Sequence, residues 1–235
     1  MFLLKWFRRI LIWGSLLFFA SSVGIVLVYR VVNPPLTPLM LIRLFQQAGD
    51  GMRPRLRHTW VPLDEMPEAM PLAVVASEDQ LFARHSGFDF KQIAQALEER
   101  ETGRRIRGGS TISQQTAKNL FLWPSRSWLR KGLEAYFTVL IEWLWPKERI
   151  LETYLNSIET GPGLYGVEAV AREHFGRPAS RLSRADCALI AATLPNPLRY
   201  SSATPSAYMR QRQRWILRQM NNLGTWRYNA AKADD

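Results

Sequence analysis

Residues 107–119 read RGGSTISQQTAKN, a glycine-containing turn followed by a helical segment with only polar and cationic side chains on one side. Thr111 and Gln114 have the spacing of a capping box, so we expect a helix to begin near Ser110 or Thr111. The free N–H groups and the positive dipole end of that helix would face whatever Gly109 allows to approach. Taken alone, the segment is equally compatible with an anion-binding site and with an ordinary capped surface helix.

Four other segments accompany this one in a fixed order. They are EDQLFARHSG at 78–87, RKGLE at 130–134, KERILETYLN at 147–156, and YGVEA at 165–169 with HFG at 174–176. All five segments match signatures of the bacterial peptidoglycan glycosyltransferases, so the chain resembles that family from about Trp60 to Pro197. Five matches in order and at similar spacing are far rarer by chance than any one of them, which makes the resemblance specific.

The resemblance implies a lysozyme-like glycosyltransferase domain with two lobes and a cleft between them. It also implies that the protein polymerises lipid II into β-1,4-linked glycan strands during peptidoglycan synthesis and releases undecaprenyl diphosphate. Helical periodicity after the N-terminus independently supports a mostly α fold class. The sequence contains no Ser-x-x-Lys or Lys-Thr-Gly motif, so the resemblance is to the monofunctional, biosynthetic type.

Two other functions stay open at this point. A lytic enzyme of lysozyme-like fold would cleave glycan strands with a lone glutamate, but it needs neither a cation cluster nor a membrane anchor. An inactive membrane scaffold that recruits cell-division or elongation proteins would keep the fold while losing Glu78 or Glu134. Both glutamates are present in the sequence.

An apolar stretch near the N-terminus predicts a membrane anchor. Residues 10–29 carry no charge, and 20 such residues are enough to span a bilayer as one transmembrane helix. Three basic residues precede the stretch and only Arg30 follows closely, which places the N-terminus in the cytoplasm. A cleaved signal peptide is the alternative, because residues 20–22 loosely resemble a cleavage site, but the apolar run continues beyond them. We therefore expect a single-pass protein of the bacterial inner membrane with its catalytic domain on the periplasmic side.

Length and charge limit the domain organisation and the partners. A chain of 235 residues has room for one domain of good size plus an appendage. We expect a cytoplasmic tip and anchor at 1–30, a linker with a short helix at 31–58, and the glycosyltransferase domain at 59–235. Four of the 31 basic residues and none of the 20 acidic ones precede position 31, which leaves a net charge of +7 outside. The expected partners are lipid II, the nascent glycan strand and membrane lipids, and not nucleic acid.

The first segment supplies the expected catalytic base. Glu78 matches the family's essential glutamate, and a position in a cleft beside Phe82 would suit proton transfer. From the residues alone, a helix-end carboxylate satisfied by neighbouring N–H groups is the favoured interpretation. Asp79 is expected to orient Glu78 or to hold a divalent cation, Mg²⁺ or Mn²⁺. His85 is either a catalytic or substrate-binding group or a structural hydrogen-bonding residue.

Glu134 is the second expected acid, on the same helix face as Arg130. By the resemblance it assists on the donor side, through a bound cation or by orienting basic groups; a plain intrahelical salt bridge is the alternative. Lys118, Arg126, Arg130 and Lys131 match basic positions of the family, and such groups bind phosphate oxygens.

Neutral groups complete the predicted substrate site. Those expected to contact the substrate are Phe82, Gly109, Ser110, Thr111, Gln114, Gln115 and Asn119. Large apolar residues at 120–124 and 128–129 lie beside the expected phosphate-binding cations. They would either dip into the bilayer and receive the polyprenyl chain or pack in the core.

Capping residues and apolar periods place the other helices. Thr37, Asp89 and Ser127 are expected to begin helices, and Gly103 to end the one that begins at Asp89. The helix after Pro146 is expected to have an inner face made of Ile150, Leu151, Tyr154 and Leu155.

Overall fold

The computed structural model describes residues 2–101, 109–125 and 127–224, and it is mostly helical, as predicted. The helices are α1 (Phe2–Val31), α2 (Pro38–Gly49), α3 (Ala69–Glu78), α4 (Phe90–Glu101), α5 (Ile112–Phe121), α6 (Trp128–Leu144), α7 (Lys147–Ser157), α8 (Gly166–Phe175), α9 (Arg184–Thr193) and α10 (Ala207–Leu223). Two 3₁₀ turns, Leu63–Glu65 and Ala179–Arg181, and the strands β1 (Arg57–His58), β2 (Glu159–Gly161) and β3 (Leu164–Tyr165) accompany them.

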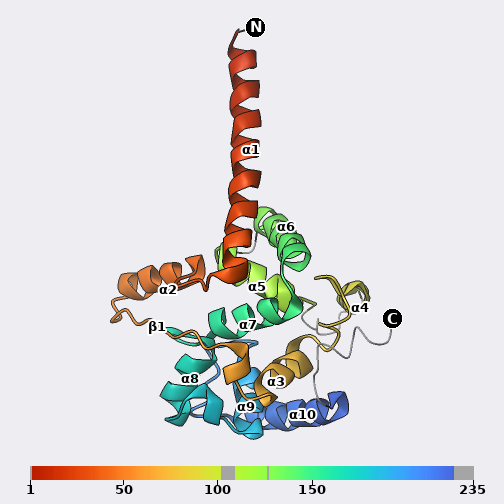
Figure 1. Cartoon of the computed structure of the whole chain (residues 1–235). Coiled ribbons are helices and arrows are strands. Elements are labelled where there is room, and N and C mark those ends of the chain that lie inside the picture. The colour runs from red at the N-terminus through yellow and green to blue at the C-terminus, as the bar shows by residue number, and fades with distance from the viewer. Residues whose placement is uncertain (1, 102–108, 126, 225–235) are drawn as a thin grey trace.

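The helices form two groups. α3 packs against α9 and α10, while α5 packs against α6 and α7. Figure 1 shows α5 and α6 close to the foot of α1, and α8, α9 and α10 on the side far from it. Residues that bridge the two groups are therefore placed to line a cleft between them.

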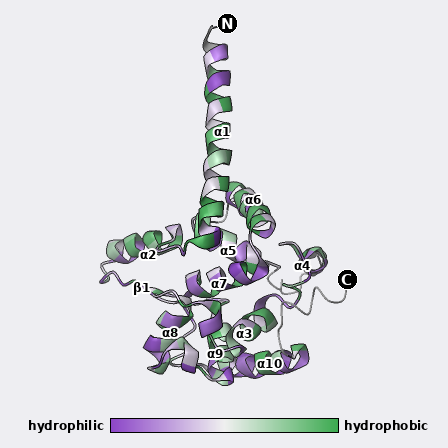
Figure 2. Ribbon diagram, in the orientation of Figure 1, coloured by the Kyte–Doolittle hydropathy of each residue, from purple (hydrophilic) through white to green (hydrophobic). Residues whose placement is uncertain are grey.

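Helix α1 projects from the domain and is apolar over most of its length (Figures 1 and 2). Its stretch Lys5–Val31 is long and apolar enough to cross a membrane, in agreement with the predicted anchor. The foot of the helix is docked: Trp145 Nε1 donates to the carbonyl of Val26 at 2.8 Å, and Arg149 Nη2 donates to the carbonyls of Tyr29 and Val32, each at 2.8 Å. The anchor and the domain are thus joined by specific hydrogen bonds as well as by the chain.

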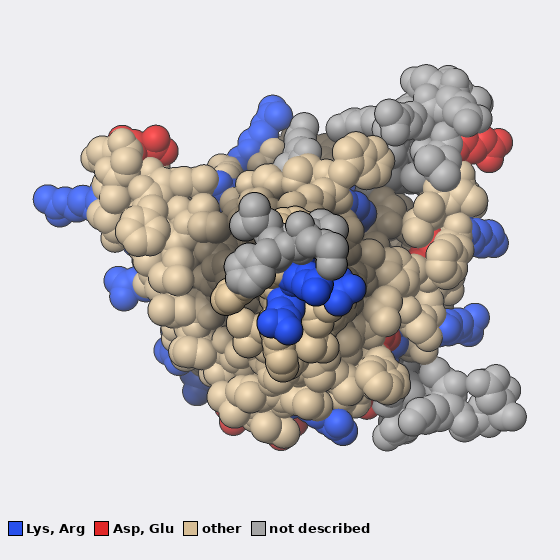
Figure 3. All heavy atoms as spheres, turned by 90° about the horizontal axis from the view of Figure 1, so that it is seen from above, with Lys and Arg blue, Asp and Glu red and all other residues tan. Residues whose placement is uncertain are grey.

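The surface seen along α1 has few charges apart from those at the helix tip and the rim. In the view from above, Lys and Arg side chains gather around the end of α1, and most of the surrounding surface is uncharged (Figure 3).

The sequence left open whether the apolar residues at 120–124 and 128–129 are exposed or pack in the core, and the structure contains both cases. Leu120 and Leu122 are buried in the core, whereas Trp123, Trp128 and Leu129 are exposed, Trp128 by 90%.

Helix starts follow their predicted caps. Thr111 and Gln114 form the capping box of α5, and the side chains of Ser127 and Thr37 accept N–H bonds at the starts of α6 and α2. Asp89 accepts a bond from the N–H of Gln92 at the start of α4. The predicted end of that helix at residue 103 lies outside the described residues.

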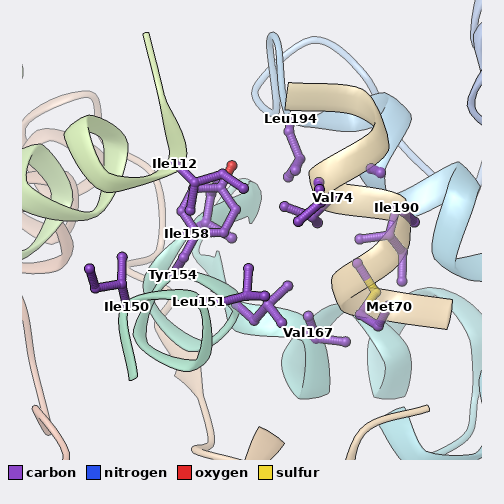
Figure 4. Close-up of a cluster of buried hydrophobic side chains, with 14 of the residues drawn as sticks. Met70, Val74, Ile112, Ile150, Leu151, Tyr154, Ile158, Val167, Ile190 and Leu194 are labelled. Carbon is purple, nitrogen blue, oxygen red and sulfur yellow. The ribbon is translucent and has the colours of Figure 1, made fainter. Parts of the chain in front are cut away.

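The core lies between α3, α7 and α9 (Figure 4). Met70 and Val74 of α3 face Leu151 of α7 and Ile190 of α9, and all four are at most 1% exposed. The predicted inner face of α7, Ile150, Leu151, Tyr154 and Leu155, is fully buried. The period of its apolar residues therefore placed this helix correctly.

A small sheet, which the sequence did not predict, lies beside the core. Its strand order is β1-β3-β2, with β1 parallel and β2 antiparallel to β3. Strands of two and three residues are too short for an alternating pattern to be recognised. The sheet matters because it places Glu159 and Tyr165 next to the cleft described below.

We expect Gly166→Ala to destabilise the fold. Gly166 has φ +78°, and a Cβ there would lie 2.5 Å from the Asn156 carbonyl oxygen. The left-handed conformation alone costs a non-glycine residue about 1–2 kcal/mol, and the contact adds to it. The measurement is the unfolding midpoint in detergent micelles. Gly132→Ala is the matched control: its Cβ would meet nothing within 4 Å on a helix, so it should stabilise by about 0.5–1 kcal/mol. Equal midpoints for both variants would contradict this reading.

Candidate active site

A cleft of about 580 Å³ opens beside α5. Its lining residues are Leu39, Arg43, Gln115, Lys118, Asn119, Leu122, Trp123, Pro124, Ser125, Arg130, Ile158, Glu159 and residues 194–198. The predicted residues Gln115, Lys118, Asn119 and Arg130 therefore come together in one cavity. The amide and ammonium groups of α5 form one wall of it.

Glu78 joins this cleft through Gln115. The carboxylate ends α3 with its side chain 14% exposed, and Gln115 Nε2 donates to its Oε2 at 3.1 Å. The Tyr154 hydroxyl donates to Gln115 Oε1 at 3.1 Å, and Ser77 Oγ donates to Glu78 Oε1 at 2.9 Å. Gln115 is thus held from both ends, and it fixes Glu78 of one helical group against α5 of the other.

Asp79 connects the first segment to the start of α5. Its buried carboxylate lies 2.9 and 3.0 Å from His85 Nε2 and accepts the N–H of Ile112 at 3.0 Å. The Gly87 N–H donates to His85 Nδ1, so the proton of the neutral ring is on Nε2, facing Asp79. These contacts correspond to the structural reading of His85 and tie Asp79 to the start of α5, while the predicted action of Asp79 on Glu78 stays a prediction.

The helix start predicted to bind a substrate anion is already occupied. The Asp79 carboxylate takes the N–H of Ile112, and the Gln114 side chain takes that of Thr111. Thr111 and Gln114 are 3% and 4% exposed and serve as caps, and their predicted contact with substrate stays a prediction. Ser110 is exposed and Gly109 half-buried just before the helix, and neither lines the cleft.

Phe82 also differs from its predicted role. Its ring is fully buried, with Lys147 Nζ 4.5 Å from the ring centroid. Lys147 Nζ in turn donates to the His85 carbonyl and to Glu142, each at 2.7 Å. Phe82 therefore supports the segment that presents Glu78 and does not touch a ligand in the cleft.

Positive charge gathers where α5 meets α6. Glu134 is 3% exposed and pairs with Arg130 and Lys131, so the salt bridge considered from the sequence is present. Burial lowers the pKa of the Lys118 ammonium from its ordinary value, and the Glu134 carboxylate opposes that shift. Within the described part of the chain, Lys118 donates no hydrogen bond, which leaves its ammonium for a ligand in the cleft. Arg126 lies outside the described residues.

The side chains near Asp79 do not fit a divalent cation. Both Asp79 oxygens already accept hydrogen bonds, and Glu134 is paired with two cations. No group of three or more His, Cys, Asp or Glu side chains suited to a metal ion occurs among the described residues. We therefore derive no catalytic step through a metal, and the predicted Mg²⁺ or Mn²⁺ site stays a prediction.

The lining of the cleft also contains a pair that sequence reasoning missed. Arg43 of α2 lies with its Nε 3.4 Å from Glu159 Oε2 of β2. Burial raises the pKa of Glu159, and the nearby Arg43 and Lys118 cations oppose that shift. Both residues line the cleft with Lys118. The only sequence signal was the amphipathic pattern of α2, which gives no reason to single out Arg43.

Lys118 and Arg130 line this cleft, and Gln115 connects it to the hydrogen-bonded carboxylate of Glu78. A carboxylate can accept a proton from a hydroxyl, and cations can stabilise a departing anion. A family model described as transglycosylase matches residues 46–221. The chain belongs to the transglycosylase family. Its domain is lysozyme-like, as the resemblance implied.

Two relatives are similar in sequence to nearly the whole of this chain. A protein of Bacteroides thetaiotaomicron is 55% identical over 219 residues, covering 93% of this chain and 87% of its own length. A protein of Pseudomonas aeruginosa is 52% identical over 221 residues, covering 93% and 94%. Both are named biosynthetic peptidoglycan transglycosylase. The transglycosylase match begins within the segment predicted as a linker, and the predicted domain boundaries themselves stay a prediction.

Proposed function

We propose that this protein is a peptidoglycan glycosyltransferase that polymerises lipid II into linear β-1,4 glycan strands and releases undecaprenyl diphosphate. One observation carries the proposal: Gln115 links the Glu78 carboxylate to the same cleft that holds Lys118 and Arg130. Membership of the transglycosylase family and relatives named for biosynthesis support it.

The reaction follows from these groups. Glu78 accepts the proton of the acceptor sugar's 4-hydroxyl as that oxygen attacks C1 of the donor sugar. The bond between C1 and the diphosphate oxygen breaks, and the diphosphate leaves with the electron pair. Lys118 and Arg130 neutralise the charge that develops on the leaving group, while Glu134 keeps Arg130 and Lys131 in place. The two lobes align the substrates, which lowers the barrier further.

The proposed location is the cytoplasmic membrane, with a single pass and the catalytic domain outside. The apolar helix α1 and the basic residues before it support this orientation. Exposed Trp123, Trp128 and Leu129 would then lie at the bilayer surface, where aromatic side chains are stable and where a polyprenyl chain arrives. The contacts with cell-division or elongation proteins stay a prediction.

One experiment separates this proposal from the two alternatives. Purified full-length protein in detergent is given lipid II in one reaction and isolated peptidoglycan in another, each with and without a chelator. We expect glycan longer than one disaccharide from lipid II and no shortening of peptidoglycan. Shortened peptidoglycan would favour the lytic enzyme, and no change in either substrate would favour the scaffold. Loss of polymerisation with chelator alone would support the predicted cation.

The pH dependence of turnover should reflect Lys118. Because burial lowers the pKa of this ammonium, it loses its proton at a lower pH than an exposed lysine does. Stabilisation of the leaving diphosphate should therefore decline as pH rises through that lowered value. In the Lys118→Arg variant the guanidinium stays protonated over the pH range in which Lys118 loses its proton. Turnover by this variant should therefore decline only at higher pH than turnover by the wild type. Superimposable alkaline limbs would exclude Lys118 as the titrating group.

A further inference from the structure

We propose that Arg43 of helix α2 is a substrate-binding residue that contacts the diphosphate of the lipid-linked substrate in the same cleft as Lys118, and that Glu159 positions it. The inference deepens the proposed function and rests on it for the identity of the substrate. Nothing in the five segments of the resemblance contains Arg43, which precedes all of them.

Helix α2 is fixed against the domain by its buried face. Met40 is fully buried and Leu39 is 8% exposed, and both pack with the buried Tyr165 of β3. Arg43 follows Leu39 by one helical turn, so the two share a face, and both line the cleft. The packing of α2 therefore places a cation in the cavity from a part of the chain that lies outside the five segments of the resemblance.

The side chain of Arg43 is held in place and still has a free donor. Its Nε lies 3.4 Å from Glu159 Oε2, and its Nη1 donates to Gln46 Oε1 at 2.9 Å. The Tyr165 hydroxyl donates to Glu159 Oε1 at 3.4 Å, which secures the carboxylate from its other side. No described residue accepts a hydrogen bond from Nη2 of Arg43. The guanidinium is oriented by protein groups and keeps donor capacity for a ligand in the cleft.

The charges around the cavity match a diphosphate. Arg43, Lys118 and Arg130 line one cleft, and among its described lining residues only Glu159 is acidic. The Lys118 cation lowers the pKa of Glu159, against the larger effect of burial, so the two side chains lie within electrostatic range of each other. A diphosphate in the cleft would meet more than one cation, and an arginine fork suits phosphate oxygens.

The other face of α2 fixes the depth at which Arg43 lies. Leu41 and Phe45 are one turn apart and exposed, Phe45 by 76%. Apolar side chains on an amphipathic helix beside a membrane anchor are buried at the headgroup boundary. The diphosphate of a membrane-bound polyprenyl substrate lies at that same level. Arg43, on the domain-facing side of the helix, is therefore at the right depth to receive it.

The test compares Arg43→Met with Arg55→Met in the full-length protein in detergent micelles. Met keeps the apolar stem of arginine and removes its charge. Arg55 is the matched control, because it forms an exposed ion pair with Glu173 at 2.6 Å and does not line the cleft. The measurements are kcat and KM on lipid II, the affinity for a polyprenyl diphosphate without turnover, and the melting temperature.

We expect Arg43→Met to weaken polyprenyl diphosphate binding by about 10-fold to 100-fold, the value of a charge-assisted hydrogen bond, and to lower kcat/KM on lipid II by at least a similar factor. Arg43→Lys should recover part of the loss, and Glu159→Gln should give a smaller loss than Arg43→Met. Arg55→Met should match the wild type.

Unchanged diphosphate affinity in Arg43→Met, or an equal loss in Arg55→Met, would overturn the proposal. A weaker binding to phosphatidylglycerol vesicles with normal diphosphate affinity would mean a membrane headgroup contact, and would overturn it as well. The binding assay needs no turnover. If Arg43→Met weakens diphosphate binding as expected but the wild type does not polymerise lipid II, the proposed function is refuted and the diphosphate site is retained.

Discussion

Glu78→Gln is expected to abolish glycan polymerisation while leaving the fold intact. The amide keeps the volume of the side chain, and its oxygen can still accept from Gln115 while its NH2 donates to the Ser77 hydroxyl, but it cannot take the proton of the attacking hydroxyl. Loss of a general base costs about 10²–10⁴ in rate. The measurement is the turnover of lipid II at saturation, beside the melting temperature of the same preparation.

Glu173→Gln is the control for that experiment. Glu173 forms an exposed pair with Arg55 away from the cleft, so its loss should change neither rate nor melting temperature appreciably. Near-normal polymerisation by Glu78→Gln would remove Glu78 from the mechanism. Glu159 would then be the carboxylate to examine, since it lines the cleft itself.

Lys118→Ala should lower kcat by about 10²–10³, the cost of removing one preorganised group that stabilises developing negative charge. New negative charge appears on the leaving diphosphate in the transition state, so a cation there acts more on the chemical step than on substrate binding. Removing a buried ammonium that donates to no described residue should not destabilise the protein in the same proportion. The measurement is kcat and the melting temperature on one preparation.

Lys91→Ala supplies the comparison, because Lys91 is an exposed residue of α4. Its variant should behave as the wild type does. If Lys118→Ala keeps its kcat but melts at a lower temperature, Lys118 is a structural residue, and the anion site at the junction of α5 and α6 would have to be given up.

Local signals in the sequence predicted much of the fold. Capping side chains at Thr37, Thr111 and Ser127 give correct helix starts, because each satisfies backbone N–H groups of its own first turn. The apolar period of α7 and the uncharged stretch of α1 depend likewise on neighbours in sequence. Such features can be predicted because their partners lie within a few residues.

The parts that could not be predicted depend on contacts between distant segments. Residues 107–119 pointed to an anion site at the helix start, yet Asp79, 33 residues before Ile112, supplies the anion there. The cations Lys118 and Arg130, which line the cleft, lie later on α5 and on α6. The Arg43–Glu159 pair joins residues more than a hundred positions apart, and no local pattern marks either of them.

The central claim is that this cleft joins disaccharide units by displacing a lipid diphosphate. The most direct measurement follows a single reaction of the full-length protein with lipid II and counts both new β-1,4 linkages and released undecaprenyl diphosphate. The account predicts that one diphosphate is released for every linkage formed, and that Glu78→Gln stops both together. Release of diphosphate without new linkages, or glycan shortening with no release, would contradict it.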